Sequence, residues 1–156
     1  MKKIAVFPGS FDPFTKGHEN VVHKAMNLFD EIIISIGVNS TKSSYYSLES
    51  RKKHILSLFE NNPKISVQSY QSLTTEFCKV NQANYILRGL RDVKDFEYER
   101  SISQMNHALS PEIETVFLIT DPIFNHLNSS IIREIAKNGG VIDNFVTNAQ
   151  ILVTTL

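Results

Sequence analysis

The sequence predicts one α/β domain with a Rossmann-like, doubly wound, five-stranded parallel sheet that has helices on both faces. Short apolar or β-branched runs alternate with longer segments of helical periodicity, and no repeat or linker divides the 156 residues. The composition is 42% hydrophobic and 21% charged, typical of a globular chain that can bury a core without disulfides or metals. We therefore expect a single domain over 1–156, with ligands bound at the carboxyl ends of the strands.

The first half of the chain predicts three strands and two helices. The apolar run at 3–7 ends at a Pro-Gly pair, which stops a strand. Residues 18–29 place five apolar side chains on one helical face, and the continuous β-branched run at 32–38 is typical of a strand covered on both sides. A serine can cap a helix over about 47–59, and 65–70 follows as the third strand.

The second half predicts two more strands, each followed by a helix. A short helix over about 75–81 precedes a strand at 84–88, which stops at a glycine. A longer helix covers about 93–109, and the run TVFLI predicts a fifth strand at 115–119. The last clear helix, 130–138, ends at two glycines. The residues from Asn148 onward are expected as either a short helix or a mobile tail.

Charge and cysteine content argue against several classes of protein. Sixteen Lys and Arg balance sixteen Asp and Glu, whereas a general nucleic-acid binder is usually basic. The single cysteine, Cys78, excludes an internal disulfide framework and a multi-cysteine zinc site, and it favours a reducing compartment. The N-terminal apolar run is too short for a signal peptide, and no later run is long enough to span a membrane. We expect a cytoplasmic protein that binds neither nucleic acid nor membrane.

The segment GSFDPFTKGH, residues 9–18, leads from the first strand into a helix. Gly9 permits a tight turn beside a ligand, and a helix N-terminus offers unpaired N–H groups to a phosphate. Ser10 and His18 would add polar side chains to such a site. The segment is neither a G-x-G-x-x-G nor a Walker A motif, and by position alone His18 is as readily an ordinary helix-start histidine.

Basic residues follow two further strands. Lys42 lies in the polar loop after the second strand, where a solvated lysine and a phosphate ligand are both consistent with the sequence. Arg88 and Arg91 flank a glycine at the end of the fourth strand, an arrangement that suits phosphate binding. Asp95 and Glu99 place like charges on one helical face, which predicts a partner such as a ribose hydroxyl or a neighbouring subunit.

The last helix opens with three residues that favour helix N-termini, in the segment LNSSIIREI. Capping explains one of Asn128, Ser129 and Ser130, and the others suit a polyphosphate. Arg133 either supports that charge or faces solvent, and His126 lies in a loop that follows a strand. No residue spacing resembles a zinc site or a G-x-S-x-G nucleophile turn. The remaining histidines are expected to be ordinary surface or boundary residues: His23, His54 and His107.

These segments, in this order, resemble the bacterial phosphopantetheine adenylyltransferases of the nucleotidyltransferase superfamily with the H/T-x-G-H motif. The motif is Thr15-Lys16-Gly17-His18, and GSFDP, RGLR, DFEYE and the serine-containing helix start make the match specific over essentially the whole chain. The resemblance implies transfer of AMP from ATP to 4'-phosphopantetheine, giving dephospho-coenzyme A and pyrophosphate. It also implies dependence on Mg²⁺, a homohexamer and feedback inhibition by coenzyme A.

The resemblance further implies roles for individual residues, without a protein ligand for the metal. Catalysis is implied for His18, Lys42, Arg91 and Ser10. Acceptor binding is implied for Ser10, Lys42, Leu73, Thr74 and Arg88. ATP binding is implied for Ser10, Phe11, His18, Gly89, Leu90, Arg91, Glu99, Phe124, Asn125, His126, Leu127, Asn128, Ser129 and Ser130. Ser10 stands where the family often has Thr, and Asn128 where it usually opens a run of serines.

The expected reaction is an in-line displacement without a covalent enzyme intermediate. The attacking phosphate oxygen is already anionic, so no general base is needed, and cations and N–H groups would offset repulsion between two polyanions. Two other acceptor classes stay open: a nicotinate or nicotinamide mononucleotide and, with cytidylyl transfer, a glycerol phosphate, although RGLR and DFEYE argue against both by resemblance. A non-catalytic nucleotide-binding module on the same fold is a further alternative.

Overall fold

The computed structural model describes residues 1–155 and contains every expected strand and helix. The strands are β1 (Ile4–Gly9), β2 (Glu31–Gly37), β3 (Ile65–Tyr70), β4 (Tyr85–Leu90) and β5 (Glu114–Ile119). The helices are α1 (Lys16–Ala25), α2 (Leu48–Leu58), α3 (Thr74–Val80), α4 (Val93–Leu109) and α5 (Ser129–Lys137), with short 3-10 helices at Pro122–Phe124 and Ala149–Ile151. None of the helices over residues 1–155 is long and apolar enough to cross a membrane.

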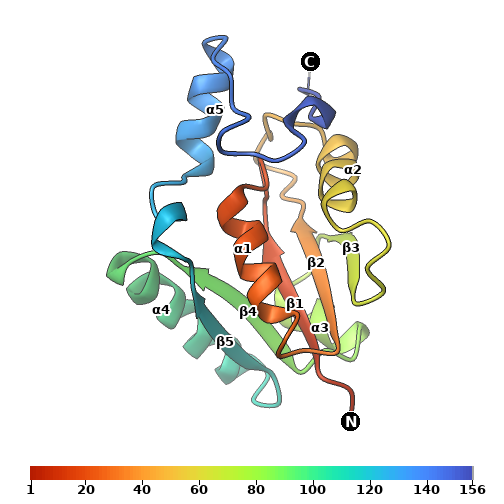
Figure 1. The fold of residues 1–156 in the computed structure, drawn as a ribbon. Helices are drawn as coiled ribbons and strands as arrows, with labels where there is room; N and C mark the ends of the chain where they lie inside the picture. Colours follow the sequence, from red (N-terminus) through yellow and green to blue (C-terminus); the bar gives the residue numbers. More distant parts are fainter. Residues whose placement is uncertain (156) are drawn as a thin grey trace.

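All five strands are parallel and lie in the order β3-β2-β1-β4-β5, which confirms the predicted Rossmann-like sheet (Figure 1). Successive side chains of a strand point to opposite faces. Phe7 of β1 therefore packs with α1 and α2 on one face, while Val6 packs with α3 on the other. Ile34 and Ile33 of β2 divide in the same way. This double coverage explains the continuous apolar runs.

Three elements end two or more residues away from the expected positions. β4 continues past Arg88, because Gly89 and Leu90 keep their register opposite β5, so the expected stop at the glycine was wrong. β1 continues past Phe7 through Pro8 and Gly9, because both residues keep their register opposite β2. α1 ends at Ala25, before the end of the expected helix. The chain then turns, with the amide of Phe29 bonded to the carbonyl of Ala25, and Phe29 still reaches the core. The spacing of buried apolar side chains therefore extends past the last helical residue, which is why the sequence predicted a longer helix.

The sheet parts between its central strand, β1, and the neighbouring strand β4. β1 pairs with β2 from Ile4 to Gly9, but it pairs with β4 only at Ala5 and Val6. Beyond Val6 the two strands are no longer paired, and Pro8 has no N–H to offer β4. Because the strand order reverses at β1 and β4, this opening lies where doubly wound sheets bind ligands.

The described part of the C-terminal segment is ordered, so the helical alternative is correct and the mobile one is wrong. After the 3-10 helix, Thr154 forms an antiparallel bridge with Tyr46, and the amide of Ser47 donates to the carbonyl of Val153. The segment lies beside α2 (Figure 1). His54 of α2 is fully buried there, with Nε2 2.7 Å from the carbonyl of Thr147, so the expectation of a surface or boundary residue was wrong for His54.

Candidate active site

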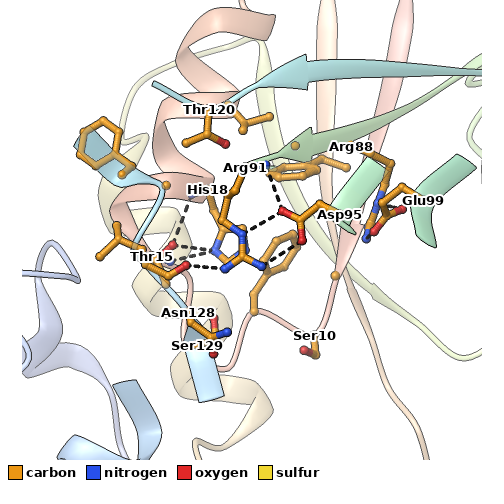
Figure 2. Close-up of a pocket in the computed structure, with 18 of the residues that line it drawn as sticks. Ser10, Thr15, His18, Arg88, Arg91, Asp95, Glu99, Thr120, Asn128 and Ser129 are labelled. Atoms are coloured by element: carbon orange, nitrogen blue, oxygen red, sulfur yellow. Dashed lines mark hydrogen bonds and ion pairs between the residues drawn. The ribbon is translucent and has the colours of Figure 1, made fainter. Parts of the chain in front are cut away.

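A cavity of about 310 Å³ opens where β1 and β4 part, as the fold predicts (Figure 2). Its walls come from the turn after β1, the start of α1, the end of β4, the residue after β5 and the start of α5. Three segments singled out in the sequence therefore meet in one place. The expected site residues in its lining are Ser10, Phe11, His18, Arg88, Gly89, Arg91, Glu99, Phe124, Leu127, Asn128, Ser129 and Ser130.

The N-terminus of α1 holds the imidazole of His18 through the helix cap. Thr15 is the N-cap: its Oγ1 accepts from the amide of His18 at 3.4 Å, and its own amide donates to His18 Nδ1 at 2.9 Å. His18 thus takes the place that Glu or Gln occupies in an ordinary capping box. Because Nδ1 accepts this bond, the ring proton resides on Nε2 in the neutral imidazole.

The surroundings of His18 keep it neutral. The rings of Phe7, Phe11 and Phe14 lie within 6.3 Å of the imidazole, measured between centroids. Burial, followed by the positive charges of Arg88 and Arg91, lowers the pKa of His18 to about 3. At neutral pH His18 is therefore an uncharged side chain with a single donor, Nε2–H.

Arg88 is fixed at the border of the cavity by a buried carboxylate. Its Nε donates to Glu99 Oε2 at 2.8 Å, its Nη2 donates to Glu99 Oε1, and its Nη1 donates to the carbonyl of Pro8. Glu99 is only 8% exposed. This bond to Pro8 spans the gap between β4 and β1. A guanidinium has five N–H donors, so Arg88 retains donors for a ligand.

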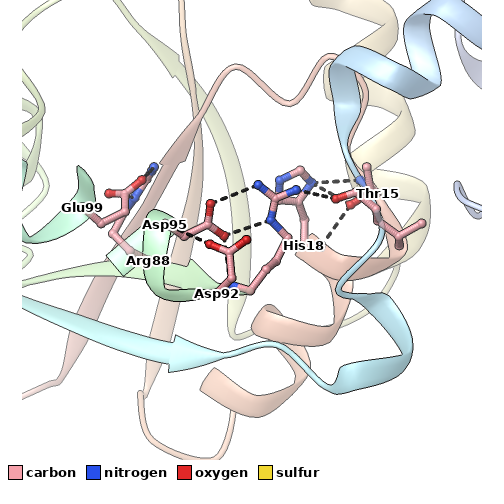
Figure 3. Close-up of polar contacts among 8 residues, drawn as sticks. Thr15, His18, Arg88, Asp92, Asp95 and Glu99 are labelled. Atoms are coloured by element: carbon pink, nitrogen blue, oxygen red, sulfur yellow. Dashed lines mark hydrogen bonds and ion pairs between the residues drawn. The ribbon is translucent and has the colours of Figure 1, made fainter. Parts of the chain in front are cut away.

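Arg91, which directly follows β4, is fixed in the same manner. Its Nε and Nη2 donate to the two carboxylate oxygens of Asp95 at 2.9 and 3.0 Å, and its Nη1 donates to the carbonyl of Leu127 at 2.6 Å. Hydrogen bonding to the Arg91 side chain lowers the pKa of Asp95, and the same bond raises the pKa of Arg91. Figure 3 shows Asp95 between the Arg88–Glu99 pair and His18.

These pairs correct the expectation for the two acids of α4. Asp95 and Glu99 share a helical face, but each carboxylate is bonded to an arginine from the end of β4. The two arginines therefore explain why the like charges are tolerated, and the expectation of a ribose or subunit partner for them was wrong. Asp95 was not among the expected site residues, although its position four residues after Arg91 was a signal.

The start of α5 is tied to the turn after β1. Asn128 is the N-cap, and its Oδ1 accepts from the amides of Ser130 and Ile131 at 2.9 and 3.2 Å. Ser129 Oγ donates to the carbonyl of Pro13 at 3.0 Å. Arg133 is half-buried and is not part of the cavity lining; it donates to the carbonyl of Asp12 and to Ser130 Oγ.

A second cavity, of about 290 Å³, adjoins the first. Both include Pro8, Gly9, Ser10, Arg88 and Glu99 in their lining. The second extends between α3 and α4, with Tyr70 and Thr74 on one side and Ile102, Ser103 and Asn106 on the other. A wider hollow of about 500 Å³ lies between the loops after β2 and β3 and includes Leu73 and Thr74.

Four expected site residues line none of these cavities. Leu90 is buried in the sheet, whereas Asn125 and His126 are exposed beyond the 3-10 helix that follows β5. Lys42 is exposed on the loop after β2. Conversely, the lining includes Thr120, to which no role had been given. It comes directly after β5, where the rule of strand ends places ligand contacts.

The chain is similar in sequence to one set of curated proteins. The family model described as cytidylyltransferase-like matches residues 6–135. A phosphopantetheine adenylyltransferase of Cytophaga hutchinsonii is 47% identical over 146 residues, which cover 94% of this chain and 97% of that protein. The protein of the same name from Flavobacterium psychrophilum is 49% identical over 136 residues, covering 87% and 89% of the two chains.

Solved structures share the fold at much lower identity. A bifunctional NMN adenylyltransferase/ADP ribose pyrophosphatase from Francisella tularensis, complexed with AMP and manganese, superposes with a TM-score of 0.71 at 20% identity. The match covers 97% of this chain and 46% of that one. The nicotinic acid mononucleotide adenylyltransferase of Plasmodium falciparum gives a TM-score of 0.68 at 18% identity, covering 97% and 93%. These likenesses show the fold alone.

Proposed function

The chain belongs to the phosphopantetheine adenylyltransferases of the cytidylyltransferase-like family, and we propose that it transfers AMP from ATP to 4'-phosphopantetheine, releasing pyrophosphate and dephospho-coenzyme A. One observation carries this assignment beyond the family. Two cavities meet at the turn after β1 and share Ser10 and Arg88. Two anionic substrates can therefore bind next to each other. The proposal assigns the nucleotide to the first cavity and the acceptor to the second.

The first cavity has the chemistry that a nucleoside triphosphate requires. It combines the N-termini of α1 and α5 with the guanidinium groups of Arg88 and Arg91. Helix N-termini and arginines both bind phosphate oxygens. The uncharged Nε2–H of His18 lies among them and would donate to the phosphoryl group as charge develops during transfer. Gly89 and the start of α5 supply the rest of the proposed nucleotide site.

The second cavity suits an elongated acceptor with a phosphate at one end. Arg88 and Ser10 lie at the end shared with the nucleotide site, and Ile102 and Thr74 line the stretch between α3 and α4. Leu73 borders the neighbouring hollow, along which the pantetheine arm would continue. Lys42, on the exposed loop after β2, would approach the acceptor phosphate from the same side; this role stays a prediction.

The proposed transfer needs no protein nucleophile or general base. The acceptor phosphate oxygen is anionic near neutral pH and attacks the α-phosphorus of ATP as the bond to pyrophosphate breaks. The protein aligns the two groups and offsets their charge. Incubation with ATP alone should leave the protein unmodified, and intact-mass spectrometry that found an adenylylated chain would contradict the direct transfer.

We propose that Mg²⁺ enters as part of the nucleotide substrate, held by phosphate oxygens. Over residues 1–155 there is no group of three or more His, Cys, Asp and Glu side chains that could hold a metal. The carboxylates nearest the phosphate cavity, Asp95 and Glu99, are already bonded to arginines. Mg²⁺ commonly keeps several waters and is bound through substrate phosphates, so the present residues suit such an arrangement.

Assembly into a homohexamer is a further proposal, supported by a surface feature of α4. Tyr98, Ile102, Met105 and Leu109 follow one another along a single face of this helix, and all four are exposed. A second copy of the chain would cover this face. Native mass spectrometry should find hexamers, with smaller species for Met105→Glu; a monomeric wild type would contradict the proposal.

Feedback by coenzyme A and a cytoplasmic location are also proposed. Coenzyme A combines an adenine nucleotide with a pantetheine arm and would therefore extend across both cavities. It should inhibit by competition with 4'-phosphopantetheine, and inhibition without such competition would contradict this binding mode. Immunolocalisation in fractionated cells tests the location.

The decisive experiment is an acceptor screen. Purified protein is mixed with Mg²⁺, ATP and 4'-phosphopantetheine, pyrophosphate is followed, and the product is identified by mass spectrometry. Parallel reactions offer nicotinate or nicotinamide mononucleotide with ATP, and glycerol phosphate with CTP. Dephospho-coenzyme A formed by the wild type but not by His18→Ala is the expected result. Product from another acceptor alone would replace the assignment, and nucleotide binding without any transfer would favour a non-catalytic module.

A further inference from the structure

Arg51 of α2 is a buried cation outside all three cavities. It is 5% exposed, and its donors go to three separate acceptors of the chain. Nε donates to the carbonyl of Tyr46 at 3.1 Å, Nη2 donates to Ser44 Oγ at 3.0 Å, and Nη1 donates to the carbonyl of Ser10. One side chain therefore connects the turn after β1 with the base of the loop that carries Lys42.

Asp12 connects the same two segments from the other side. It is 6% exposed, and its two carboxylate oxygens accept from the amides of Tyr45 and Tyr46 at 2.8 and 2.9 Å. The carbonyl of Asp12 in turn accepts from Arg133 of α5 at 2.7 Å. The base of the loop, residues 44–46, is thus bonded through two amides to Asp12, which follows β1, and through a side chain and a carbonyl to Arg51 of α2.

The remainder of this loop is a short turn that ends at Lys42. Asn39 Oδ1 accepts from the amide of Thr41 at 2.9 Å, and the amide of Lys42 donates to the carbonyl of Asn39. Lys42 therefore lies between a turn that begins at the end of β2 and a base that is fixed to the Ser10 turn. A shift of that base moves Lys42 relative to Ser10.

Stability alone is a poor explanation for Arg51. Burying a guanidinium has a large desolvation cost, and burial lowers the pKa of Arg51 although the negative charge of nearby Asp12 acts in the opposite direction. Apolar side chains of similar size often replace buried charges without loss of stability. What an apolar residue cannot do is bind three acceptors from two loops at the same time.

We infer that Arg51 is a positioning residue for the transfer reaction: it holds the turn of Ser10 and the loop of Lys42 in one fixed unit, so that both side chains reach the same acceptor phosphate. The inference rests on the proposed function for its kinetic readout. It predicts that disturbing Arg51 affects the acceptor more than the nucleotide, because Lys42 belongs to the acceptor side and because His18 and Arg91 are held by other contacts.

The test uses Arg51→Lys, which keeps the charge without the planar fork, and Ser44→Ala, which removes one acceptor at the surface end of the network. The matched control is Lys53→Met, an exposed cation on the same helix. Arg51→Lys should raise the KM for 4'-phosphopantetheine by about tenfold or more and lower kcat, with the KM for ATP changed by less than about threefold. Ser44→Ala should act in the same direction with a smaller effect, and the control should match the wild type.

A double-mutant cycle with Lys42→Ala separates positioning from general damage. If Arg51 acts by placing Lys42, Arg51→Lys should raise the acceptor KM much less in the Lys42→Ala background. Full additivity in the cycle, or equal increases of both KM values, would overturn the inference.

Amide hydrogen exchange supplies a readout that requires no activity. The amides of Tyr45 and Tyr46 should exchange at least about tenfold faster in Arg51→Lys than in Lys53→Met, while the core amides of β2 stay protected. Unchanged exchange at both tyrosines would overturn the inference, whether or not the wild type is active. Inactivity of the wild type towards 4'-phosphopantetheine would instead refute the proposed function.

Discussion

At the scale of single residues, His18 donates a hydrogen bond but supplies no positive charge, whereas a charged side chain would do both. Three phenylalanine rings and two nearby arginines hold its imidazole neutral, and the amide of Thr15 directs the remaining proton to Nε2. The positive charge of the site is then supplied by Arg88 and Arg91, whose carboxylate partners fix their orientation. A neutral donor adds a directed hydrogen bond without a further desolvated charge.

This arrangement predicts a specific kinetic effect for His18→Ala. We expect kcat to fall by roughly 10²–10³-fold with KM values changed by only a few-fold, because the lost bond is strongest in the transition state. Steady-state kinetics with both substrates measure the effect, and the exposed His23→Ala on the same helix is the control. A loss confined to KM would contradict the assigned role.

The same residue should show no titration in the working range of the enzyme. With a pKa of about 3, His18 stays neutral between pH 6 and 8, so kcat should carry no ionisation from this side chain there. NMR of the imidazole nitrogens should report the Nε2–H tautomer throughout this range. A charged imidazole at pH 6 would contradict the role of an uncharged donor.

At the scale of elements, α4 supplies one carboxylate to each arginine at the end of β4. The Arg88–Glu99 pair borders both cavities, whereas Arg91 and Asp95 border only the first. Glu99→Gln should therefore raise the KM of both substrates, and Asp95→Asn should raise chiefly that of ATP, each by roughly 5–50-fold for the loss of a charge-assisted pair. Steady-state kinetics with each substrate varied in turn measure this difference, with the exposed Glu97→Gln as the control. Equal effects of the two variants on both substrates would contradict the division between the cavities.

The approach of α1 to β4 gives another prediction at this scale. A Cβ added at Gly89 would lie 2.6 Å from Val21 Cγ2, one turn beyond His18. Gly89→Ala should displace α1, destabilise the protein by about 1–3 kcal/mol and lower kcat. Urea unfolding and kinetics measure both losses. The smaller side chain of Val21→Ala should restore part of each in the double variant, and a double variant as impaired as Gly89→Ala would exclude this contact as the cause.

The sequence predicted the elements better than their mutual contacts. Apolar periods located all five strands and the helices between them, and the rule of strand ends located the cavity. The pairing of Arg88 with Glu99 depends on how α4 lies against β4, which no local pattern reports. The three bonds of Arg51 likewise join loops that become neighbours only in the folded sheet. Tertiary contacts of this kind decide which charged side chains are held by hydrogen bonds inside the fold and which are exposed to solvent. Lys42 is one of the exposed ones.

At the scale of the whole molecule, the gap between β1 and β4 determines how the parts cooperate. Pairing ends at Val6, and beyond it a side-chain bond from Arg88 of β4 to the carbonyl of Pro8 joins the two strands. One cavity therefore adjoins α1 and α5, the other lies between α3 and α4, and Arg88 lines both at their junction. Substrates bound in the two cavities would meet at this junction, where both cavities share the turn after β1.

The buried histidines make the global stability depend on pH. Burial is the main cause that lowers the pKa values of both His18 and His54, whereas an unfolded histidine titrates near 6.5. Below pH 6.5 the unfolded state therefore binds more protons than the folded state, and the free energy of unfolding decreases as the pH falls. Because burial lowers the pKa of the fully buried His54, proton uptake by this residue on unfolding contributes to the loss of stability below pH 6.5.

Urea unfolding followed by circular dichroism at pH 7 and pH 5 tests this expectation. His54→Gln keeps an N–H for the carbonyl of Thr147 but cannot be protonated, so it should lose less stability between the two pH values than the wild type does. The exposed His23→Gln serves as the control and should lose as much as the wild type. If His54→Gln instead follows the wild type over this interval, His54 binds protons equally in the folded and unfolded states, and its burial does not cause the loss of stability at low pH.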